Sequence, residues 1–227
     1  MGLGAGWCKD SNPAALRSAV PLLCTENSQA ARTRIRGTGV IASSSGILLT
    51  AAHVIQEAHF NCTLSVMIPD DDWNRFRQLH AFLVGNCRLL PALDLAACRI
   101  HPAETSRDWA WLRPATVATR IAPTGESVWI TAFTGWGRSP LVRSGHIQGR
   151  QLYQRRDGCY CDFATDIVVE EGMSGSPLIS AEGQVVGILT LAGRGRFRGI
   201  SFGASLAEAA SFLRAEGIST EAASINK

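Results

Sequence analysis

The sequence predicts an all-β protein of two small barrels, followed by one helix near the carboxyl terminus. Apolar stretches recur every 8 to 15 residues, separated by turn residues and without an intervening helical pattern, which indicates a barrel or a sandwich. The 22 glycines and 9 prolines suit many short strands joined by turns better than a helical bundle. Two strand sets of similar size, joined near residues 102–122, favour two barrels.

The elements follow from this pattern in chain order. Strands of the first set are predicted at residues 19–24, 37–42, 46–50, 63–68, 80–84 and 93–100. Strands of the second set are predicted at residues 127–133, 141–149, 160–165, 177–180, 185–191 and 199–204. Leu206, Ala209, Ala210 and Leu213 then follow helical spacing. We expect this helix to have Ser205 as its N-cap and to end at Gly217.

Composition excludes several classes of protein. With 46% hydrophobic and 18% charged residues, the 227-residue chain is not disordered as a whole. No apolar run approaches the roughly 20 residues that span a bilayer, so no membrane span is expected. A net charge of +3 is too small to indicate nucleic acid. The first residues lack the features of a signal peptide, so we expect a cytoplasmic protein or the mature form of an exported one.

The cysteines and histidines do not form a recognisable metal or redox motif. Seven cysteines are an odd number for a disulfide framework, and the five histidines lack metal-ligand spacing. We therefore expect no metal and no organic cofactor. Cys98 lies in an apolar strand and is predicted to be a buried small hydrophobe. Pairing of Cys62 with Cys87 in an oxidising compartment stays open.

Two motifs in the first half of the chain carry candidate catalytic residues. His53 directly follows a predicted strand among small residues, where its ring can point into a cleft and exchange a proton near neutral pH. Asp94 lies at the start of an apolar strand, and a buried carboxylate needs a partner such as a histidine N–H. The alternatives are a structural histidine and an aspartate that caps a turn or strand.

The third motif surrounds Ser174. Small neighbours allow a tight turn that exposes its hydroxyl and aims the N–H groups of Gly172 and Ser174 at one point, as an oxyanion hole requires. The alternative is an ordinary surface turn. The order His53, Asp94, Ser174 differs from that of α/β-hydrolases, which also need glycine where Ser176 stands.

These motifs resemble the chymotrypsin-fold (trypsin-like) serine peptidases, and more closely the bacterial branch that includes the HtrA/DegP type and the glutamyl endopeptidases. The resemblance covers roughly residues 15–216 and is most specific around His53 and Ser174. It also rests on Gly37-Thr38-Gly39-Val40-Ile41, Gly125-Glu126-Ser127-Val128, Thr165-Asp166 and Gly183-Gln184-Val185-Val186-Gly187-Ile188. It implies two antiparallel six-stranded β-barrels with the active site in the cleft between them.

The resemblance also implies a division of the chain and the roles of its residues. An extension would cover residues 1–14, the first barrel 15–110, the second barrel 111–204, and the helix and tail 205–227. Ser174 would be the nucleophile, His53 the general base and Asp94 the residue that orients the histidine. The N–H groups of Gly172 and Ser174 would form the oxyanion hole.

The resemblance places a substrate pocket around Val168, Thr190, Leu191, Ala192, Gly199 and Ser201. Val168 occupies the position at which an aspartate selects Arg or Lys, so we expect a small-to-medium apolar P1 residue. Leu189 replaces the histidine expected in glutamyl endopeptidases. Three arginines, at 194, 196 and 198, are expected at the rim and would attract acidic groups; the alternatives are a solvated hairpin tip and a short nucleic-acid-binding segment.

The expected function is therefore a serine endopeptidase that acts on polypeptides. Met173 replaces the aspartate or asparagine that precedes the serine in the family, so activation by cleavage is not expected. No PDZ domain is expected after the helix. The main alternative is a catalytically latent or silent module that binds peptides or is activated by a regulatory partner, which a cytoplasmic protease would need. An esterase or acyl transferase with the same triad is a third alternative.

Overall fold

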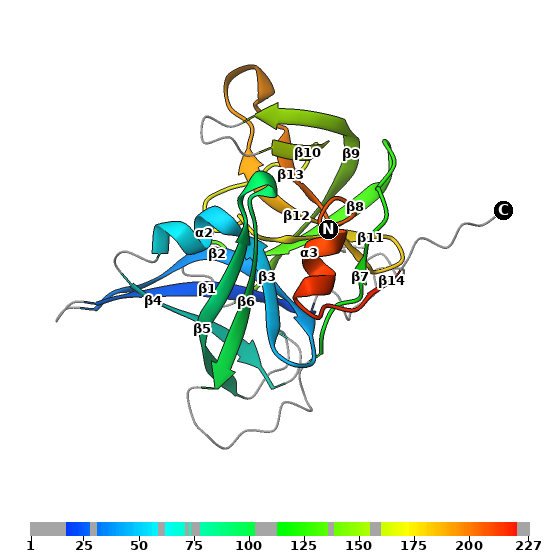
Figure 1. The fold of residues 1–227 in the computed structure, drawn as a ribbon. Coiled ribbons are helices and arrows are strands. Elements are labelled where there is room, and N and C mark those ends of the chain that lie inside the picture. Colours follow the sequence, from blue (N-terminus) through cyan, green and yellow to red (C-terminus); the bar gives the residue numbers. More distant parts are fainter. Residues whose placement is uncertain are drawn as a thin grey trace, which may run out of the picture.

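The fold consists of two antiparallel barrels, as the sequence predicts (Figure 1). This computed structural model describes residues 17–27, 31–58, 62–70, 73, 78–102, 113–135, 139–154 and 160–221. The expected amino-terminal extension, and the tryptophans at 109, 111 and 136, lie outside the described residues.

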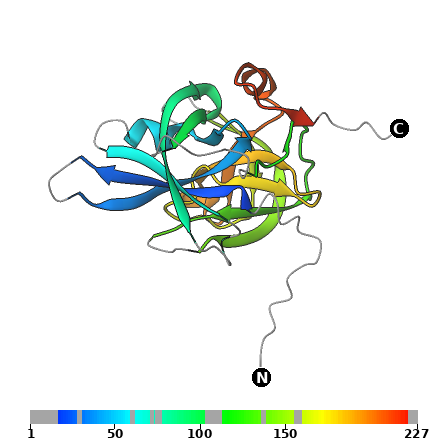
Figure 2. The ribbon, with the colours of Figure 1, turned by 90° about the horizontal axis from the view of Figure 1, so that it is seen from below.

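The first barrel is closed in the order β1-β2-β3-β6-β5-β4. Its strands are β1 (Ala19–Glu26), β2 (Thr33–Ser43), β3 (Ile47–Ala51), β4 (Cys62–Pro69), β5 (Leu79–Leu90) and β6 (Leu95–Pro102). The short helix α2 (Ala52–Ala58) follows β3 directly, and the 3₁₀ turn η1 (Pro91–Leu93) separates β5 from β6. The hairpin of β1 and β2 extends from one side of the molecule (Figure 2).

The second barrel has the order β11-β8-β9-β10-β13-β12 and is closed by the pairing of β11 with β12. Its strands are β8 (Ser127–Ala132), β9 (Leu141–Gln154), β10 (Tyr160–Thr165), β11 (Pro177–Ser180), β12 (Val185–Ala192) and β13 (Ser201–Ser205). The 3₁₀ turn η2 (Gly195–Phe197) joins β12 to β13. Two short strands extend this sheet: β7 (Val117–Ala118) pairs in parallel with β12, and β14 (Thr220–Glu221) pairs in parallel with β7.

Strand β3 is apolar at nearly every position because both of its faces are buried. Successive side chains of a strand point to opposite faces. Leu48 points into the core of the first barrel, while Ile47 and Leu49 pack in a second cluster. That second cluster also contains Ile179 and Val185 of the other barrel. Both faces of β3 are therefore buried, and the two barrels share one apolar interface beside it.

The carboxyl-terminal helix begins later than predicted. The helix α3 covers Ala210–Ala215, and Ala209 is its N-cap residue. Ser205 instead accepts a hydrogen bond from the N–H of Ala207 (3.2 Å), so it caps the turn that precedes the helix. Gly217, with φ 74°, follows the helix end as expected. Leu213 anchors α3 in the interface cluster that joins the barrels.

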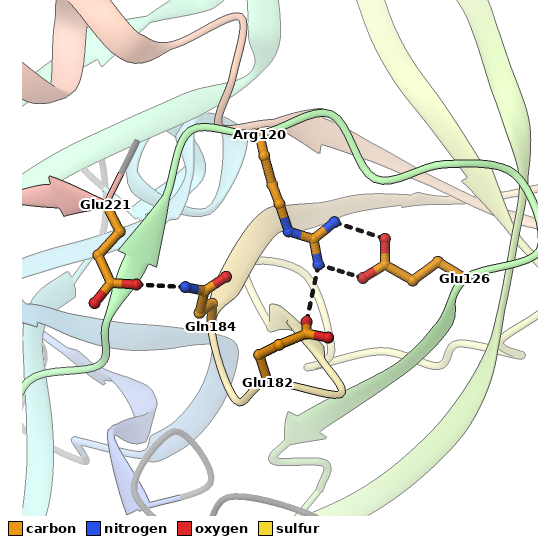
Figure 3. A network of polar contacts seen from close by, with 5 residues as sticks. All are labelled: Arg120, Glu126, Glu182, Gln184 and Glu221. Atoms are coloured by element: carbon orange, nitrogen blue, oxygen red, sulfur yellow. Dashed lines mark hydrogen bonds and ion pairs between the residues drawn. The ribbon is translucent and has the colours of Figure 1, made fainter. Parts of the chain in front are cut away.

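An ion-pair network fixes one edge of the second barrel (Figure 3). Arg120 donates two hydrogen bonds to the carboxylate of Glu126 (2.8 and 2.5 Å) and one to Glu182 (3.1 Å). The hydrogen bond with Glu126 raises the pKa of Arg120 above its usual value. Gln184 donates to Glu221, which ties β14 to the start of β12. The turn before β12 is therefore held from both sides.

The cysteines pair differently from the sequence-based expectation. Cys24 of β1 is bonded to Cys62 of β4, and Cys87 of β5 is bonded to Cys98 of β6. Cys98 is buried, as predicted, but it is not a free thiol, and Cys62 does not pair with Cys87. The partners come from neighbouring strands of the closed barrel, an adjacency set by strand order. Cys24 and Cys98 also pack in the cluster that contains Ala52 and Ile55 of α2.

Reduction of these disulfides is expected to destabilise the protein strongly. Loops of 38 and 11 residues predict losses of about 4 and about 3 kcal/mol from the free energy of unfolding. Thermal unfolding with and without reductant should then differ by more than about 10 °C. Mass spectrometry of the unreduced, digested protein identifies the linked peptides. Equal unfolding temperatures would contradict the pairing.

Candidate active site

A buried aspartate holds the backbone and ring of His53. The Oδ2 atom of Asp94 lies 2.7 Å from Nδ1 of His53, and Oδ1 accepts a hydrogen bond from the His53 backbone N–H (2.8 Å). The backbone carbonyl of Asp94 accepts a further hydrogen bond from the N–H of Ala52 (2.8 Å). Because the carboxylate faces Nδ1, it favours the tautomer with the proton there. The other ring nitrogen, Nε2, is then able to accept a proton.

The two residues reach this position from separate elements. His53 lies in the first turn of α2, immediately after β3. Asp94 follows η1 in the left-handed region (φ 52°, ψ 40°), which short polar side chains tolerate. Its side chain is 2% exposed, whereas that of His53 is 19% exposed. The carboxylate is thus shielded from water, and the imidazole reaches the surface.

The turn that carries Ser174 packs against the strands that lead to His53. The carbonyl of Ser174 accepts a hydrogen bond from the N–H of Thr38 on β2 (2.8 Å). A Cβ atom on Gly175 would lie 2.1 Å from both the carbonyl oxygen of Thr38 and Oγ1 of Thr50, so only glycine allows this approach. Thr50 precedes His53 by three residues. The structure therefore brings the partly exposed Ser174 of the second barrel next to the His53 segment of the first.

Two backbone N–H groups of this turn have no acceptor among the described residues. Within the part of the chain that the structure describes, those of Gly172 and Ser174 donate no hydrogen bond, whereas the N–H of Met173 donates to the carbonyl of Glu170 (3.1 Å). Gly172 has φ 91°, and a Cβ there would lie 2.6 Å from the carbonyl oxygen of Phe133. Two free donors on a tightly packed turn can bind an anionic oxygen.

The hydroxyl of Thr38 links both barrels at this turn. Its Oγ1 donates to the carbonyl of Gly172 (3.0 Å) and accepts from the backbone N–H of Phe133 (3.0 Å). The Thr38 side chain is fully buried. Thr38 belongs to a motif that carries the family resemblance, but sequence reasoning assigned it no role. The contact fixes the orientation of the Gly172 carbonyl.

Met173 anchors the same turn in the core of the second barrel. Its side chain is fully buried among residues that include Ile167 and Leu178. Its Sδ atom also accepts a hydrogen bond from the N–H of Glu170 (3.0 Å). An apolar anchor thus occupies the position before the serine. The resemblance leads us to expect an aspartate or asparagine at this position. Here a methionine holds the turn instead, through apolar packing and one weak hydrogen bond.

Arg143 of β9 holds the segment that leads into the turn. Its guanidinium donates to the carbonyl of Val168 and to the carboxylate of Glu170. No sequence signal singled out Arg143, because its partners lie more than 20 residues away in the chain. The side chain of Val168 itself is 56% exposed.

The other predicted pocket residues gather on the hairpin of β12 and β13. Ala192 pairs with Ser201, and Leu191 with Phe202. The side chains of Thr190 and Ser201 are buried, while Gly199 lies in the connecting turn with φ 90°.

The three rim arginines are exposed in that connecting turn. Among the described residues, Arg194, Arg196 and Arg198 form no ion pair with an acidic side chain. The guanidinium of Arg196 lies 4.9 Å from the centre of the Phe197 ring. That ring in turn packs edge-on against Phe202, with centroids 5.7 Å apart. The turn thus presents positive charge next to the predicted pocket.

The described part of the chain contains neither a metal-binding group of side chains nor a membrane-spanning helix. No group of three or more histidine, cysteine, aspartate or glutamate side chains there is arranged to hold a metal ion. None of the helices there has the length and apolarity needed to cross a membrane.

Comparisons with known proteins agree with this geometry. The profile of the trypsin-like peptidase domain matches residues 37–188. The magnetosome formation protease MamE of Magnetospirillum gryphiswaldense is 29% identical over 177 residues, which cover 73% of this chain and 20% of MamE. A probable periplasmic serine endoprotease, DegP-like, of Chlamydia trachomatis is 29% identical over 175 residues, 75% of this chain and 31% of the relative. The chain thus spans less than a third of the length of these two relatives.

Solved structures show the same fold. The MamO protease domain of Magnetospirillum magneticum matches with a TM-score of 0.68 and 18% identity, over 88% of this chain and 97% of that domain. The active form of the Rv3671c protease of M. tuberculosis matches with a TM-score of 0.65 and 22% identity, over 92% of this chain and 84% of that one.

Proposed function

This chain belongs to the family of trypsin-like peptidase domains, and we propose that it is a serine endopeptidase with the catalytic triad His53, Asp94 and Ser174. The observation that carries the proposal is the pairing of His53 with a buried carboxylate at 2.7 Å. The Ser174 turn packs against Ala51, the last residue of β3 and two residues before His53: a Cβ atom on Gly175 would lie 3.1 Å from the Ala51 backbone nitrogen. The two barrels thus supply a base with its orienting acid and a nucleophile on a tight turn.

The chemistry follows from the residue types. Ser174 Oγ attacks the carbonyl carbon of a peptide bond while Nε2 of His53 takes the hydroxyl proton. The protonated imidazole is stabilised by Asp94 and gives its proton to the leaving amine. Water, activated by the same histidine, then hydrolyses the acyl-enzyme and releases Ser174. In each step His53 either takes up one proton at Nε2 or gives it back.

The N–H groups of Gly172 and Ser174 would stabilise the oxyanion formed during both attacks. Donors that are already oriented cost no rearrangement at the moment of reaction, and removal of one such donor typically costs 10²–10³ in kcat. The fixed Gly172 carbonyl and the buried Met173 support an oxyanion hole that is formed before substrate binds. This argues against a collapsed, latent turn.

For the substrate, we propose a polypeptide with a small or medium apolar P1 residue. The pocket residues Val168, Thr190 and Ser201 carry no charge that would bind a cationic or anionic side chain. The exposed arginines at the tip of the β12–β13 hairpin would favour acidic residues elsewhere in the substrate.

A fluorophosphonate probe tests the proposed function directly, because it reacts with a serine that its base has activated. We expect the folded protein to be labelled and to cleave unfolded casein. Absence of both would favour the alternative, a latent module that needs a regulatory partner. Ester turnover without any amide hydrolysis would instead indicate an esterase or acyl transferase.

Thr38→Val is expected to slow labelling without removing any triad residue. The substitution keeps the shape of the side chain but leaves the Gly172 carbonyl and the Phe133 N–H without partners, at about 1–3 kcal/mol for each buried group. Misplacement of the oxyanion donors should lower the labelling rate by up to about 100-fold. Thr38→Ser, which keeps the hydroxyl, should label at nearly the original rate. Equal rates for both variants would refute this positioning role.

A further inference from the structure

An apolar hollow of about 190 Å³ lies beside the proposed active site, on the outer face of the first barrel. Its walls include Leu23 of β1, Ile35 of β2, Met67 of β4 and Leu79 of β5. In β1 and β4 the neighbouring residues Leu22 and Val66 point into the barrel core. Leu23 and Met67 therefore face outward, because successive strand residues alternate between faces.

Residues of both barrels close the hollow at one end. Trp73, which follows β4, packs against Phe133, which follows β8, with ring centroids 4.8 Å apart at 60°. The indole N–H of Trp73 donates to the carbonyl of Ala19 (3.1 Å). Both rings are almost fully buried. This end of the hollow is therefore held firmly, whereas Leu23, Ile35, Met67 and Leu79 remain partly exposed.

The hollow adjoins the proposed oxyanion hole. A Cβ atom built on Gly172 would lie 2.6 Å from the carbonyl oxygen of Phe133 and 3.4 Å from Cγ2 of Ile35. Ile35 and Phe133 thus line the hollow and also contact the turn that carries Gly172. The two sites share a wall.

The direction of the reaction indicates which part of a substrate would reach the hollow. The proposed P1 pocket lies on β12 and β13 of the second barrel. The leaving amine must receive its proton from His53, which belongs to the first barrel. The leaving-group segment therefore lies over the first barrel, whose strands β1, β2 and β4 form most of the hollow.

We propose that this hollow binds an apolar side chain in the leaving-group half of a polypeptide substrate, an inference that rests on the proposed function. Its volume is below the roughly 300–1,000 Å³ of sites for drug-sized ligands, and it suits a single large side chain. Burial of such a side chain predicts a gain of about tenfold or more in affinity or in kcat/KM. Selectivity would thus come from both sides of the scissile bond.

Paired fluorogenic peptides test the site. The two peptides of a pair are identical except at one position after the scissile bond, where one carries Leu and the other Ser. Different pairs vary different positions. We expect kcat/KM to be about tenfold higher for the Leu peptide at one of these positions. In Met67→Glu and Leu79→Glu this ratio should fall to about one, because each places a charge in the apolar hollow. Leu83→Glu is the matched control on the same strand as Leu79, at an exposed site outside the hollow, and it should keep the ratio.

Calorimetry of the Ser174→Ala protein with the same Leu and Ser peptides tests the site without turnover, and the hollow variants are measured in that background. A tighter Kd for the Leu peptide, lost in Met67→Glu but kept in Leu83→Glu, supports the site even in a protein that cleaves nothing. Equal affinities, or a preference that survives in both hollow variants, overturn it. Failure of fluorophosphonate labelling alongside normal peptide binding would refute the proposed function and leave the binding site standing. Circular dichroism confirms that each variant is folded.

Discussion

Ser174→Ala is expected to lower kcat for peptide hydrolysis by a factor on the order of 10⁶ and to abolish fluorophosphonate labelling. The substitution removes the nucleophile and leaves the oxyanion donors and the substrate pocket in place. His53→Ala should cost about as much, because members of a triad act as a unit. Both losses are measured with a casein-derived peptide and with the labelled fraction of purified protein.

An exposed serine without a base provides the control for this experiment. Ser45 lies in the turn between β2 and β3, where its side chain contacts Ser43. Ser45→Ala should label and hydrolyse peptide as the unmodified protein does. Persistent labelling of Ser174→Ala would show that another residue is the reactive group, and the proposed triad would then be wrong.

Asp94→Asn is expected to lower kcat by about 10⁴-fold while the fold is retained. The amide oxygen can still accept the hydrogen bond from the His53 backbone N–H, which the carboxylate now accepts at 2.8 Å. The amide nitrogen then faces Nδ1 of His53 and forces the ring proton onto Nε2. A histidine in that tautomer cannot accept the proton of Ser174, so catalysis fails without a change in shape.

A second buried aspartate separates this effect from simple destabilisation. Asp162 of β10 is buried and bonded to Arg150 (2.7 Å) in the second barrel. Asp162→Asn should lower the unfolding temperature but change kcat by only a small factor. If Asp94→Asn kept more than about a tenth of the original kcat, Asp94 would not be the residue that orients the base.

The strands were predictable from the sequence, because the signals for them are local. Alternating or continuous apolar runs and turn residues located all six strands of each barrel, with boundaries displaced by a few residues. The largest displacements concern β5, β9 and β2, which extend several residues beyond the predicted runs into more polar sequence. Backbone pairing with neighbouring strands sustains these ends, and no side-chain pattern in the strand itself reveals it.

The candidate site residues His53, Asp94 and Ser174 could also be identified from the sequence, since each lies in a short motif of small or apolar neighbours. Their roles remain a proposal. Thr38 and Arg143 were missed as positioning residues, because their partners belong to the other barrel or to a loop more than 20 residues away in the chain. A threonine in a strand or an arginine at a surface carries no signal of its own.

The meeting of groups far apart in the chain depends on tertiary structure and could not be predicted. Closure of the first barrel placed Cys24 against Cys62 and Cys87 against Cys98, against the pairing considered from sequence. The contact of the two barrels placed the Ser174 turn on Thr38 and Thr50, and it formed the hollow between Ile35 and Phe133. Period and turn chemistry act over a few neighbouring residues, whereas these contacts depend on strand order and on the packing of one barrel against the other.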